Sequence, residues 1–333
     1  MTRRSSPRLA RGPRQRGAAI LTAMLLVTLV ASLSTAALWQ QWRSTEVESA
    51  ERTRLQSAWI LQGALDWARL ILREDARSGA TDHLAEPWAV ALQEARLSTF
   101  LASDRTTGDT VQDIDEAFLS GQISDLQARL NVLNLVQDGS PHGPSVQAFA
   151  RLFEALHLPE GELSALLHNL QQTLHNPAAQ GLPAPGDNSA IALLPRSVEQ
   201  LGWLGLSPAS VAALAPYVVV LPERTAVNLN TASALVLHAC IDALSLGDAR
   251  RLVAARAQSH FRTLGDAGQA LGQTQPALVP GQHSVNSRFF EVRGQLRLGN
   301  RVVQERSVVQ REGLEVHVLW RERGVLPPLT SVQ

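Results

Sequence analysis

GAAILTAMLLVTLVASLSTAALW occupies residues Gly17 to Trp39 and contains no charged side chain. From Ala18 onward it would form a helix about 33 Å long, enough to cross the hydrocarbon core of a bilayer. Six arginines and no acidic residue precede it, and Trp39 and Trp42 lie where an aromatic belt forms at a membrane surface. We therefore expect a transmembrane helix over 18–39, with a cytoplasmic N-terminus and the rest of the chain on the other side of the membrane.

Three kinds of N-terminal segment fit this pattern. An ordinary signal peptide would be cleaved after the apolar run, and the Ser-Thr-Ala-Ala stretch at 34–37 offers small residues for such a site. An uncleaved anchor would keep the whole segment. A third kind of leader is removed before the apolar run, here between Gly17 and Ala18. An uncleaved anchor and a leader removed before the apolar run both leave the chain in the membrane with the same topology.

The composition of the remaining chain limits the classes of partner. The 333 residues include 30 basic and 30 acidic side chains, and residues 1–17 hold six of the basic ones and none of the acidic ones. The chain without that segment is therefore acidic, which argues against a surface that binds nucleic acid over the whole body. The single cysteine, Cys240, excludes an intramolecular disulfide.

A helix is expected to continue well beyond the membrane. Between Gln40 and Asp75 there is no proline and one glycine, and apolar residues recur at heptad spacing before Ser78-Gly79. This pattern predicts one helix over 18–77 that packs on a globular part of the chain. The residues of the stripe are Ala58, Leu61, Leu65, Ala68 and Leu72.

Alternation of apolar and polar residues predicts strands in two separate parts of the chain. It runs through Gly121 to Leu135, returns at 290–298 before a hairpin turn at Gly299-Asn300, and recurs from Leu314 to Trp320. Short helices separated by Pro- and Gly-containing turns are expected between these parts, with a loop at 177–190. The expected helices are 145–157, 160–175, 196–203, 208–219, 231–241, 248–258 and 265–271.

Three features of the sequence together resemble the type IV pilin-like minor pseudopilin K of type II secretion systems (general secretion pathway protein K family). They are the basic leader ending at Gly17, the Pro-Trp-Ala sequence at 87–89, and the passage from Gly121 to Leu135. The resemblance implies that a prepilin peptidase cuts between Gly17 and Ala18, with methylation of the new terminus. Most pilin-like chains have Glu at the fifth mature position, whereas this chain has Thr22, a departure typical of pseudopilin K.

The resemblance also implies an α+β fold. A long N-terminal transmembrane helix would pack on an antiparallel pilin-type sheet, with a large inserted all-α domain. The expected parts are a leader (1–17), the N-terminal helix (18–77), a pilin-like α/β domain (78–140 and 283–325), the inserted helical domain (141–282) and a flexible tail (326–333).

The implied function is structural. The chain would join minor pseudopilins I and J, form and cap the tip of the pseudopilus, and support protein export across the outer membrane. The other implied partners are the major pseudopilin and the peptidase. The implied location is the bacterial inner membrane, with a single pass and a periplasmic C-terminal domain.

A membrane-anchored DNA-binding protein of the competence type is the alternative. The segment from Val227 through Leu264 resembles a helix-hairpin-helix module, in which backbone amides of a Gly-rich hairpin hold DNA phosphates. Here the hairpin 241–247 has one glycine and an additional acid, Asp242. We therefore expect the fold of the module to be kept without its DNA site. Asn230 or Thr231 is expected to cap the following helix.

No catalytic residue and no metal ligand set is predicted. The sequence has no nucleophile elbow, no phosphate-binding glycine loop and no His-Glu-x-x-His motif, and Cys240 is expected to be a buried small residue. We expect no cofactor. Calcium is a possibility, through four loop carboxylates that precede the first predicted strand. They are Asp104, Asp109, Asp113 and Asp115.

Overall fold

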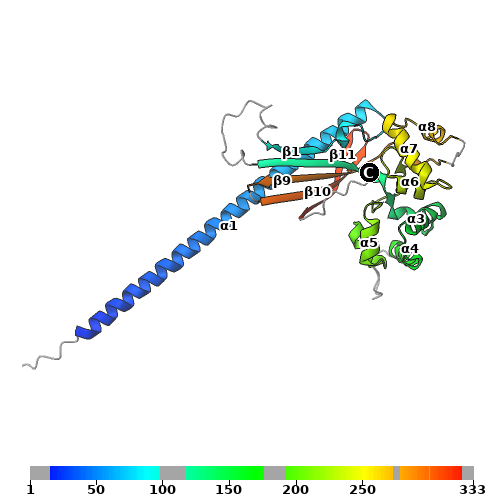
Figure 1. The fold of residues 1–333 in the computed structure, drawn as a ribbon. Coiled ribbons are helices and arrows are strands. Elements are labelled where there is room, and N and C mark those ends of the chain that lie inside the picture. The colour runs from blue at the N-terminus through cyan, green and yellow to red at the C-terminus, as the bar shows by residue number, and fades with distance from the viewer. Residues whose placement is uncertain (1–15, 98–116, 176–192, 273–277, 300, 325–333) are drawn as a thin grey trace, which may run out of the picture. The chain divides into compact units, whose positions relative to one another are not determined.

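The structure is a computed structural model that describes residues 16–97, 117–175, 193–272, 278–299 and 301–324. The chain divides into two compact units, Met1–Trp59 and Ile60–Gln333. The long helix α1 (Arg16–Ser78) begins in the first unit and ends in the second (Figure 1).

The described part of the first unit is a single helix. Its apolar side chains from Ile20 to Trp42 are exposed, and it is the one helix among the described residues that is long and apolar enough to cross a membrane. Hydroxyl side chains within it donate back to the carbonyl groups three or four residues earlier, for example Ser32 to Thr28 and Thr35 to Ala31. These bonds satisfy the hydroxyls inside the helix, as a lipid environment requires.

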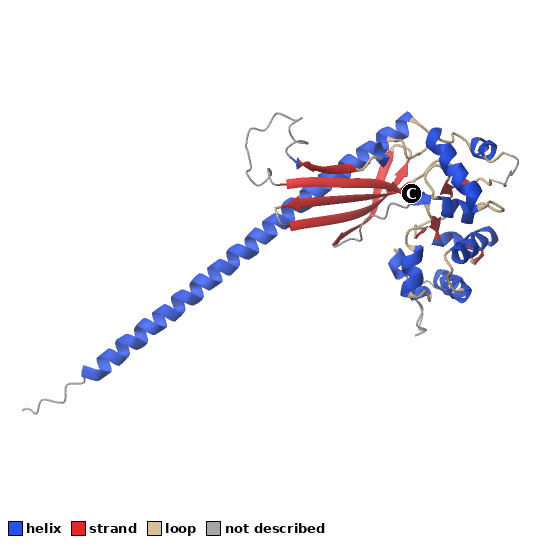
Figure 2. Ribbon diagram, in the orientation of Figure 1, coloured by secondary structure: helices blue, strands red, loops and turns tan. Residues whose placement is uncertain are grey.

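The second unit contains a five-stranded antiparallel sheet in the order β1-β2-β9-β10-β11 (Figure 2). β2 and β9 are neighbours although all the described helices other than α1 and η1 (Pro87–Ala89) lie between them in the sequence. The strands are β1 (Leu92–Arg96), β2 (Ala117–Asp125), β9 (Phe289–Leu298), β10 (Arg301–Glu312) and β11 (Glu315–Gly324).

The last turns of α1 pack on one face of this sheet. Leu65, Ala68 and Leu72 are buried against Phe290 and Val292 of β9, while Leu61 packs with residues nearer the β9–β10 turn. The predicted heptad stripe is therefore confirmed at Leu61, Leu65, Ala68 and Leu72, and the helix ends at Ser78 as expected. The short helix η1 (Pro87–Ala89) adds Trp88, whose ring meets Phe290 edge-on with centroids 5.3 Å apart.

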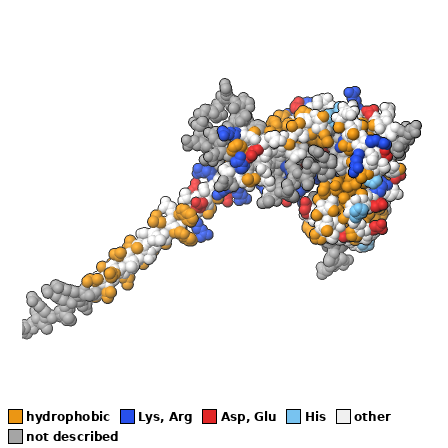
Figure 3. Space-filling model, in the orientation of Figure 1, with side chains coloured by type: hydrophobic (Ala, Val, Ile, Leu, Met, Phe, Trp, Pro, Cys, Tyr) orange, Lys and Arg blue, Asp and Glu red, His pale blue; other side chains and the backbone are white. Residues whose placement is uncertain are grey.

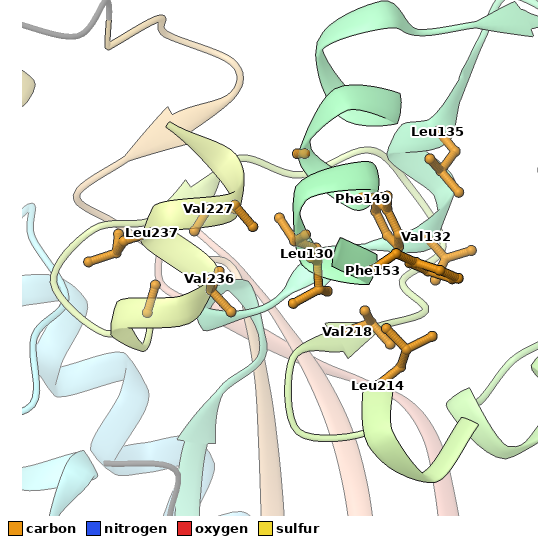
Figure 4. Close-up of a cluster of buried hydrophobic side chains, with 14 of the residues drawn as sticks. Leu130, Val132, Leu135, Phe149, Phe153, Leu214, Val218, Val227, Val236 and Leu237 are labelled. Carbon is orange, nitrogen blue, oxygen red and sulfur yellow. The ribbon is translucent and has the colours of Figure 1, made fainter. Parts of the chain in front are cut away.

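Seven helices, two short 3-10 turns and pairs of two-residue strands form the rest of the described chain between β2 and β9. They enclose a single apolar core, part of which Figure 4 shows. Phe149 and Phe153 lie at its centre beside Val132, Leu214 and Val218. The helices are α3 (Gly143–Ala155), α4 (Glu160–His175), η6 (Val198–Leu204), α5 (Pro208–Leu214), α6 (Ala234–Cys240), α7 (Leu246–Gln258) and α8 (Leu264–Ala270). The two-residue strands are β3 (Leu130–Asn131), β4 (Val136–Gln137), β5 (Ser140–Pro141), β6 (Val218–Val219), β7 (Val227–Asn228) and β8 (His283–Ser284).

The prediction of a strand from Gly121 to Leu135 was wrong over most of its length. β2 ends at Asp125, and the alternating residues that follow form two 3-10 turns, η3 (Leu126–Ala128) and η4 (Val132–Leu135). The side chain of Asp125 accepts a hydrogen bond from the amide of Gln127, and that of Asn131 accepts one from the amide of Leu133. These local bonds replace the strand ladder, because short polar side chains compete for nearby amides.

The helix prediction for 208–219 was also too long. α5 ends at Leu214, and Val218 and Val219 form a strand parallel to Leu130 and Asn131. Beta-branched valines pack well on a pleated surface, so this short pairing replaces the last helical turn. The expected loop at 177–190 lies outside the described residues.

The C-terminal strands follow the prediction in part. Leu298 pairs with Arg301, which confirms the two-residue connection at 299–300, although Asn300 lies outside the described residues. The alternation predicted for β9 was wrong at its start, since Phe289, Phe290, Glu291 and Val292 are all buried. The second face of the sheet is covered there, because Phe289 packs with Val219 and Leu221 from the helical region. Leu314 lies in the turn before β11 and is exposed, contrary to prediction.

Candidate functional site

The predicted processing site lies at the start of α1. The helix begins at Arg16, so Gly17 and Ala18 lie in its first turn, and cleavage between them stays a prediction. The Thr22 hydroxyl lies 3.0 Å from the carbonyl oxygens of both Ala18 and Ala19. It is therefore turned back onto its own helix and offers no charge to a neighbouring molecule.

A second feature is an exposed apolar face on the part of α1 that packs on the sheet. Trp67 is 50 % exposed and Leu70 is 42 % exposed, while the buried stripe lies on the opposite side of the helix. Gly63 precedes Trp67 by one helical turn and so lies on the same face. A Cβ atom added at Gly63 would meet nothing within 4 Å, so no contact inside the described chain requires a glycine at this point.

This face continues into a groove between α1 and the turn that joins β10 to β11. Leu314, 46 % exposed, lies across the groove from Leu70. The Arg69 Nε donates to the Val316 carbonyl at 2.9 Å and holds the helix against the edge strand. Residues lining the groove are Asp66, Arg69, Leu70, Arg73, Leu314, Glu315, Val316 and His317.

The charged residues around this face have partners within the chain. Arg69 pairs with Asp66 at 2.9 Å and Arg77 pairs with Glu74 at 2.7 Å, both along the helix. Because these charges are paired, the part of this surface that lacks a partner among the described residues is its apolar area. We define the assembly face as Gly63, Trp67, Leu70 and Leu314. Figure 3 colours the hydrophobic side chains of the described residues orange.

The third feature is a buried polar junction at the end of α1. The Arg311 guanidinium donates to Asp75 at 2.9 Å, to both oxygens of Asp82 at 2.5 Å and 2.7 Å, and to the Ser287 carbonyl at 2.9 Å. It also lies over the Phe290 ring, 4.9 Å from its centroid. One side chain of β10 therefore joins the last turns of α1, the following loop and the segment before β9.

The same junction extends to the helical region through Asp125 at the end of β2. Its Oδ2 atom accepts hydrogen bonds from Thr231 at 2.6 Å, Ser287 at 2.6 Å and Asn228 at 3.0 Å. The predicted capping role of Asn230 or Thr231 was wrong, because Ser233 caps α6 and Thr231 is committed to Asp125.

The carboxylates of Asp75, Asp82 and Glu86 lie within 4.8 Å of one another, a spacing that metal sites also show. In this case Arg311 contacts two of them and the Trp88 indole donates to Glu86 at 2.6 Å. Arg311 therefore supplies a positive charge to two of the three carboxylates, and an uncharged indole N–H holds the third. The four loop acids suggested for calcium, Asp104, Asp109, Asp113 and Asp115, lie outside the described residues.

Comparison with known proteins identifies the family. Two family models, both described as type II secretion system (T2SS), protein K, match residues 128–223 and 227–286. The type II secretion system protein K of Pseudomonas aeruginosa is 28 % identical over 93 % of both chains. This chain belongs to the type II secretion system protein K family. The family is that of a minor pseudopilin, a structural component of the secretion system.

A second curated relative agrees with this membership, and a solved structure shares the fold. The protein K of Klebsiella pneumoniae is 28 % identical, covering 94 % of this chain and 97 % of its own. A chain in the crystal structure of the GspK-GspI-GspJ complex from enterotoxigenic Escherichia coli matches with a TM-score of 0.61 at 18 % identity. That match covers 83 % of this chain and 98 % of the other, and it shows a common fold, as the α+β prediction required.

The segment that resembles a helix-hairpin-helix module carries groups that disfavour DNA. In the hairpin, Ala243 adopts a left-handed conformation with φ 55°, where a glycine would be favourable. Asp242 beside it is exposed and pairs with Arg151 at 3.0 Å. Asp248 lies in the first turn of α7. Its backbone amide donates to the Ser245 hydroxyl, and its carboxylate contacts Arg251. Carboxylates therefore lie where phosphates would have to approach.

Two other groups of the segment have structural roles. The Arg256 Nη1 donates to the Leu229 carbonyl at 2.6 Å, and burial lowers the pKa of this guanidinium to about 10. The thiol of Cys240 is half-buried, and burial raises its pKa to about 12. Both groups are therefore shifted away from their ordinary titration range by partial burial.

Proposed function

We propose that this chain joins minor pseudopilins I and J and caps the tip of the type II secretion pseudopilus, thereby supporting protein export across the outer membrane. The observation that carries the proposal is the assembly face on α1. Large apolar side chains rarely cluster on the surface of a soluble domain without a partner. The relative of known structure was crystallised with two other chains, named GspI and GspJ, which supports the choice of partners.

The glycine within the assembly face supports helix-to-helix packing. Glycine inside a helix costs about 1 kcal/mol relative to alanine. Gly63 has open space around it in the chain, so its lack of a side chain has no internal benefit. A partner helix that crosses α1 there gains close backbone approach, and Trp67 and Leu70 supply apolar contact area on one side of the crossing.

The capping role has two supports. Thr22 keeps its hydroxyl within the helix and lacks the carboxylate that would pair with the amino terminus of the next subunit in the bilayer. We further propose that residues 141–282 act as a domain inserted into a pilin-like one. Such a bulky helical region would block the addition of another subunit on its side.

Processing and topology complete the proposal. The peptidase cuts between Gly17 and Ala18, and the mature chain stays in the inner membrane with its C-terminal part in the periplasm and contacts the major pseudopilin. Replacing Gly17 by a bulky residue should make the uncut form accumulate in the membrane. Normal trimming of that variant would count against this step alone.

Co-purification tests the assembly claim. The full chain is co-expressed with the I and J subunits of its own secretion system, extracted in mild detergent and purified by affinity. The wild-type chain should retain both subunits, and Gly63→Leu should lower their recovery at least several-fold. Gly161→Leu is the matched control, because Gly161 in α4 also has open space around its Cβ position.

The possible results separate two claims. Failure of the wild-type chain to retain I and J would contradict the proposed function. Equal recovery with Gly63→Leu would keep the partners but place the contact elsewhere on the chain.

A further inference from the structure

The buried junction at the end of α1 has an unequal number of opposite charges. Four carboxylates share it with one guanidinium: Asp75, Asp82, Glu86, Asp125 and Arg311. All five side chains are largely withdrawn from solvent; Asp82 is 1 % exposed and Asp125 5 %. Charged groups in such surroundings are stable only when they are paired.

Arg311 compensates only part of this charge. It contacts Asp75 and Asp82, whereas Glu86 accepts hydrogen bonds from the Trp88 indole at 2.6 Å and the His83 amide at 2.9 Å. Asp125 is held entirely by uncharged donors. Two carboxylates therefore remain buried without direct contact to a cation of fixed charge.

Proton binding is the simplest way to relieve this imbalance. Burial, followed by the nearby Glu86 charge, raises the pKa of Asp75 to about 6. Burial likewise raises the pKa of Asp125 to about 6, in opposition to its hydrogen bonds, and it raises the pKa of Glu86. Asp75 and Asp125 would therefore take up protons in mildly acidic solutions.

Other titratable and charged groups face the junction from the neighbouring elements. The rings of His83 and His260 are stacked, with centroids 3.8 Å apart, and His83 Nε2 lies 3.6 Å from Glu86. Burial lowers the pKa of both imidazoles, so protonation of these two rings opposes folding in acid. Arg262 interacts with His260, and Arg129 interacts with Asp125 at longer range.

We propose that the junction is a proton-dependent latch, in which protonation of Asp75 and Asp125 in mild acid tightens the hold of the sheet on the end of α1 and on the helical region, and their ionisation toward neutral pH loosens it. The hydrogen bonds survive this change. Hydroxyl groups can either donate or accept, so the Thr231 and Ser287 hydroxyls can accept from a protonated Asp125. Thr231 then has the Asn228 carbonyl, 3.5 Å away, as its own acceptor.

The direction in which folding stability changes with pH follows from proton linkage. The folded-state pKa of Asp75 lies above the unfolded value, so the folded chain binds more protons in mild acid. The stabilisation is complete below about pH 4 and is lost as the pH rises through about 6. Asp125 acts in the same direction. Each aspartate changes the folding constant roughly fourfold between about pH 5.5 and pH 7.5.

Hydrogen exchange of the full chain in detergent micelles tests the latch. Exchange rates of peptides that cover 79–90 and 225–232 are measured between about pH 5.5 and pH 7.5 and corrected for intrinsic rates. We expect the protection of these peptides in the wild type to fall on the order of tenfold across this range, because two aspartates contribute. Peptides in the β9–β10 hairpin turn serve as the internal reference.

Asp75→Asn isolates one member of the latch. An asparagine keeps an oxygen for Arg311 and mimics the protonated state, so this variant should lose roughly fourfold of the pH dependence. Glu74→Gln, at an exposed neighbouring position, should retain the wild-type profile. The difference between variant and wild type removes the histidine contribution, because both chains carry His83 and His260.

Two results would overturn the proposal. One is wild-type protection that is flat or rises with pH in both peptides. The other is an Asp75→Asn profile that is parallel to that of the wild type.

Discussion

The Nη2 atom of Arg311 donates to both carboxylate oxygens of Asp82, 2.5 Å and 2.7 Å away, although 229 residues separate the two in the sequence. Asp82 is 1 % exposed and Arg311 9 %. This ion pair fixes the loop after α1 to the fourth strand of the sheet, and its neighbours are also acidic. The region around it should therefore be sensitive to any change in charge.

Removal of the guanidinium should be strongly destabilising. Arg311→Met leaves Asp75 and Asp82 buried without a cation, and losing one partner of a buried pair costs about 3–5 kcal/mol. Thermal or denaturant unfolding of the full chain in micelles measures the loss. Arg77→Met, which breaks an exposed pair with Glu74, should cost less than about 1 kcal/mol. Equal effects of the two substitutions would contradict the structural role of Arg311.

The two faces of α1 should respond differently to the same substitution. Leu72 is fully buried under the sheet, so Leu72→Ala should cost about 2–5 kcal/mol of unfolding free energy. Leu70→Ala, on the assembly face, should change stability by about 0.5 kcal/mol or less while weakening recovery of the I and J subunits. A large stability loss for Leu70→Ala would show that this face is packed within the chain.

The close approach of β2 and β9 predicts the effect of adding a side chain at a glycine. A Cβ atom at Gly121 would lie 2.9 Å from the Arg293 carbonyl oxygen, and β2 cannot move away without weakening its ladder with β9. Gly121→Ala should therefore cost about 1–3 kcal/mol. Gly268→Ala in α8 meets no atom within 4 Å and should be neutral or stabilising. Denaturant unfolding measures both variants: the midpoint of Gly121→Ala should fall and that of Gly268→Ala should not. Equal midpoints would contradict the close approach of the two strands.

The cysteine should be slow to react in the folded chain. Burial raises the pKa of Cys240 to about 12, and the thiolate is the reactive form. Mass spectrometry after iodoacetamide treatment at about pH 8 should find Cys240 largely unmodified in the native chain and fully alkylated after unfolding. Complete alkylation of the native chain at the rate of a free thiol would show that the surroundings of Cys240 are open.

Local patterns in the sequence predicted the elements whose burial follows a simple period. The heptad stripe from Leu61 to Leu72 and the two-residue turn after Leu298 depend on neighbours in the chain, and both are confirmed. The long alternating passage after Gly121 misled the strand prediction. Its period of two comes from turns that Asp125 and Asn131 hold with their side chains, and such turns resemble a strand in the pattern of apolar residues.

The junction could not be predicted from the sequence, because its partners are distant. Asp75 looks like an ordinary surface acid in the last turn of a helix, Asp82 looks like one in the loop after it, and Arg311 is one of several charged residues in β10. Only the pairing of β2 with β9 across the helical region brings Asp125 to Ser287 and Thr231. The sequence contains one sign of the assembly face. Gly63 lies one turn before the exposed Trp67, on a helix that has no other glycine after residue 40.

The central claim is that α1 remains in the mature protein and contacts other pseudopilin subunits through the face around Trp67. A photo-reactive amino acid in place of Trp67, activated in intact cells that carry the complete secretion system, tests it most directly. The account predicts covalent products with the I or J subunit on a chain whose first residue, by mass spectrometry, is Ala18. A chain that begins beyond Trp39, or products with neither subunit while both are present, would contradict it.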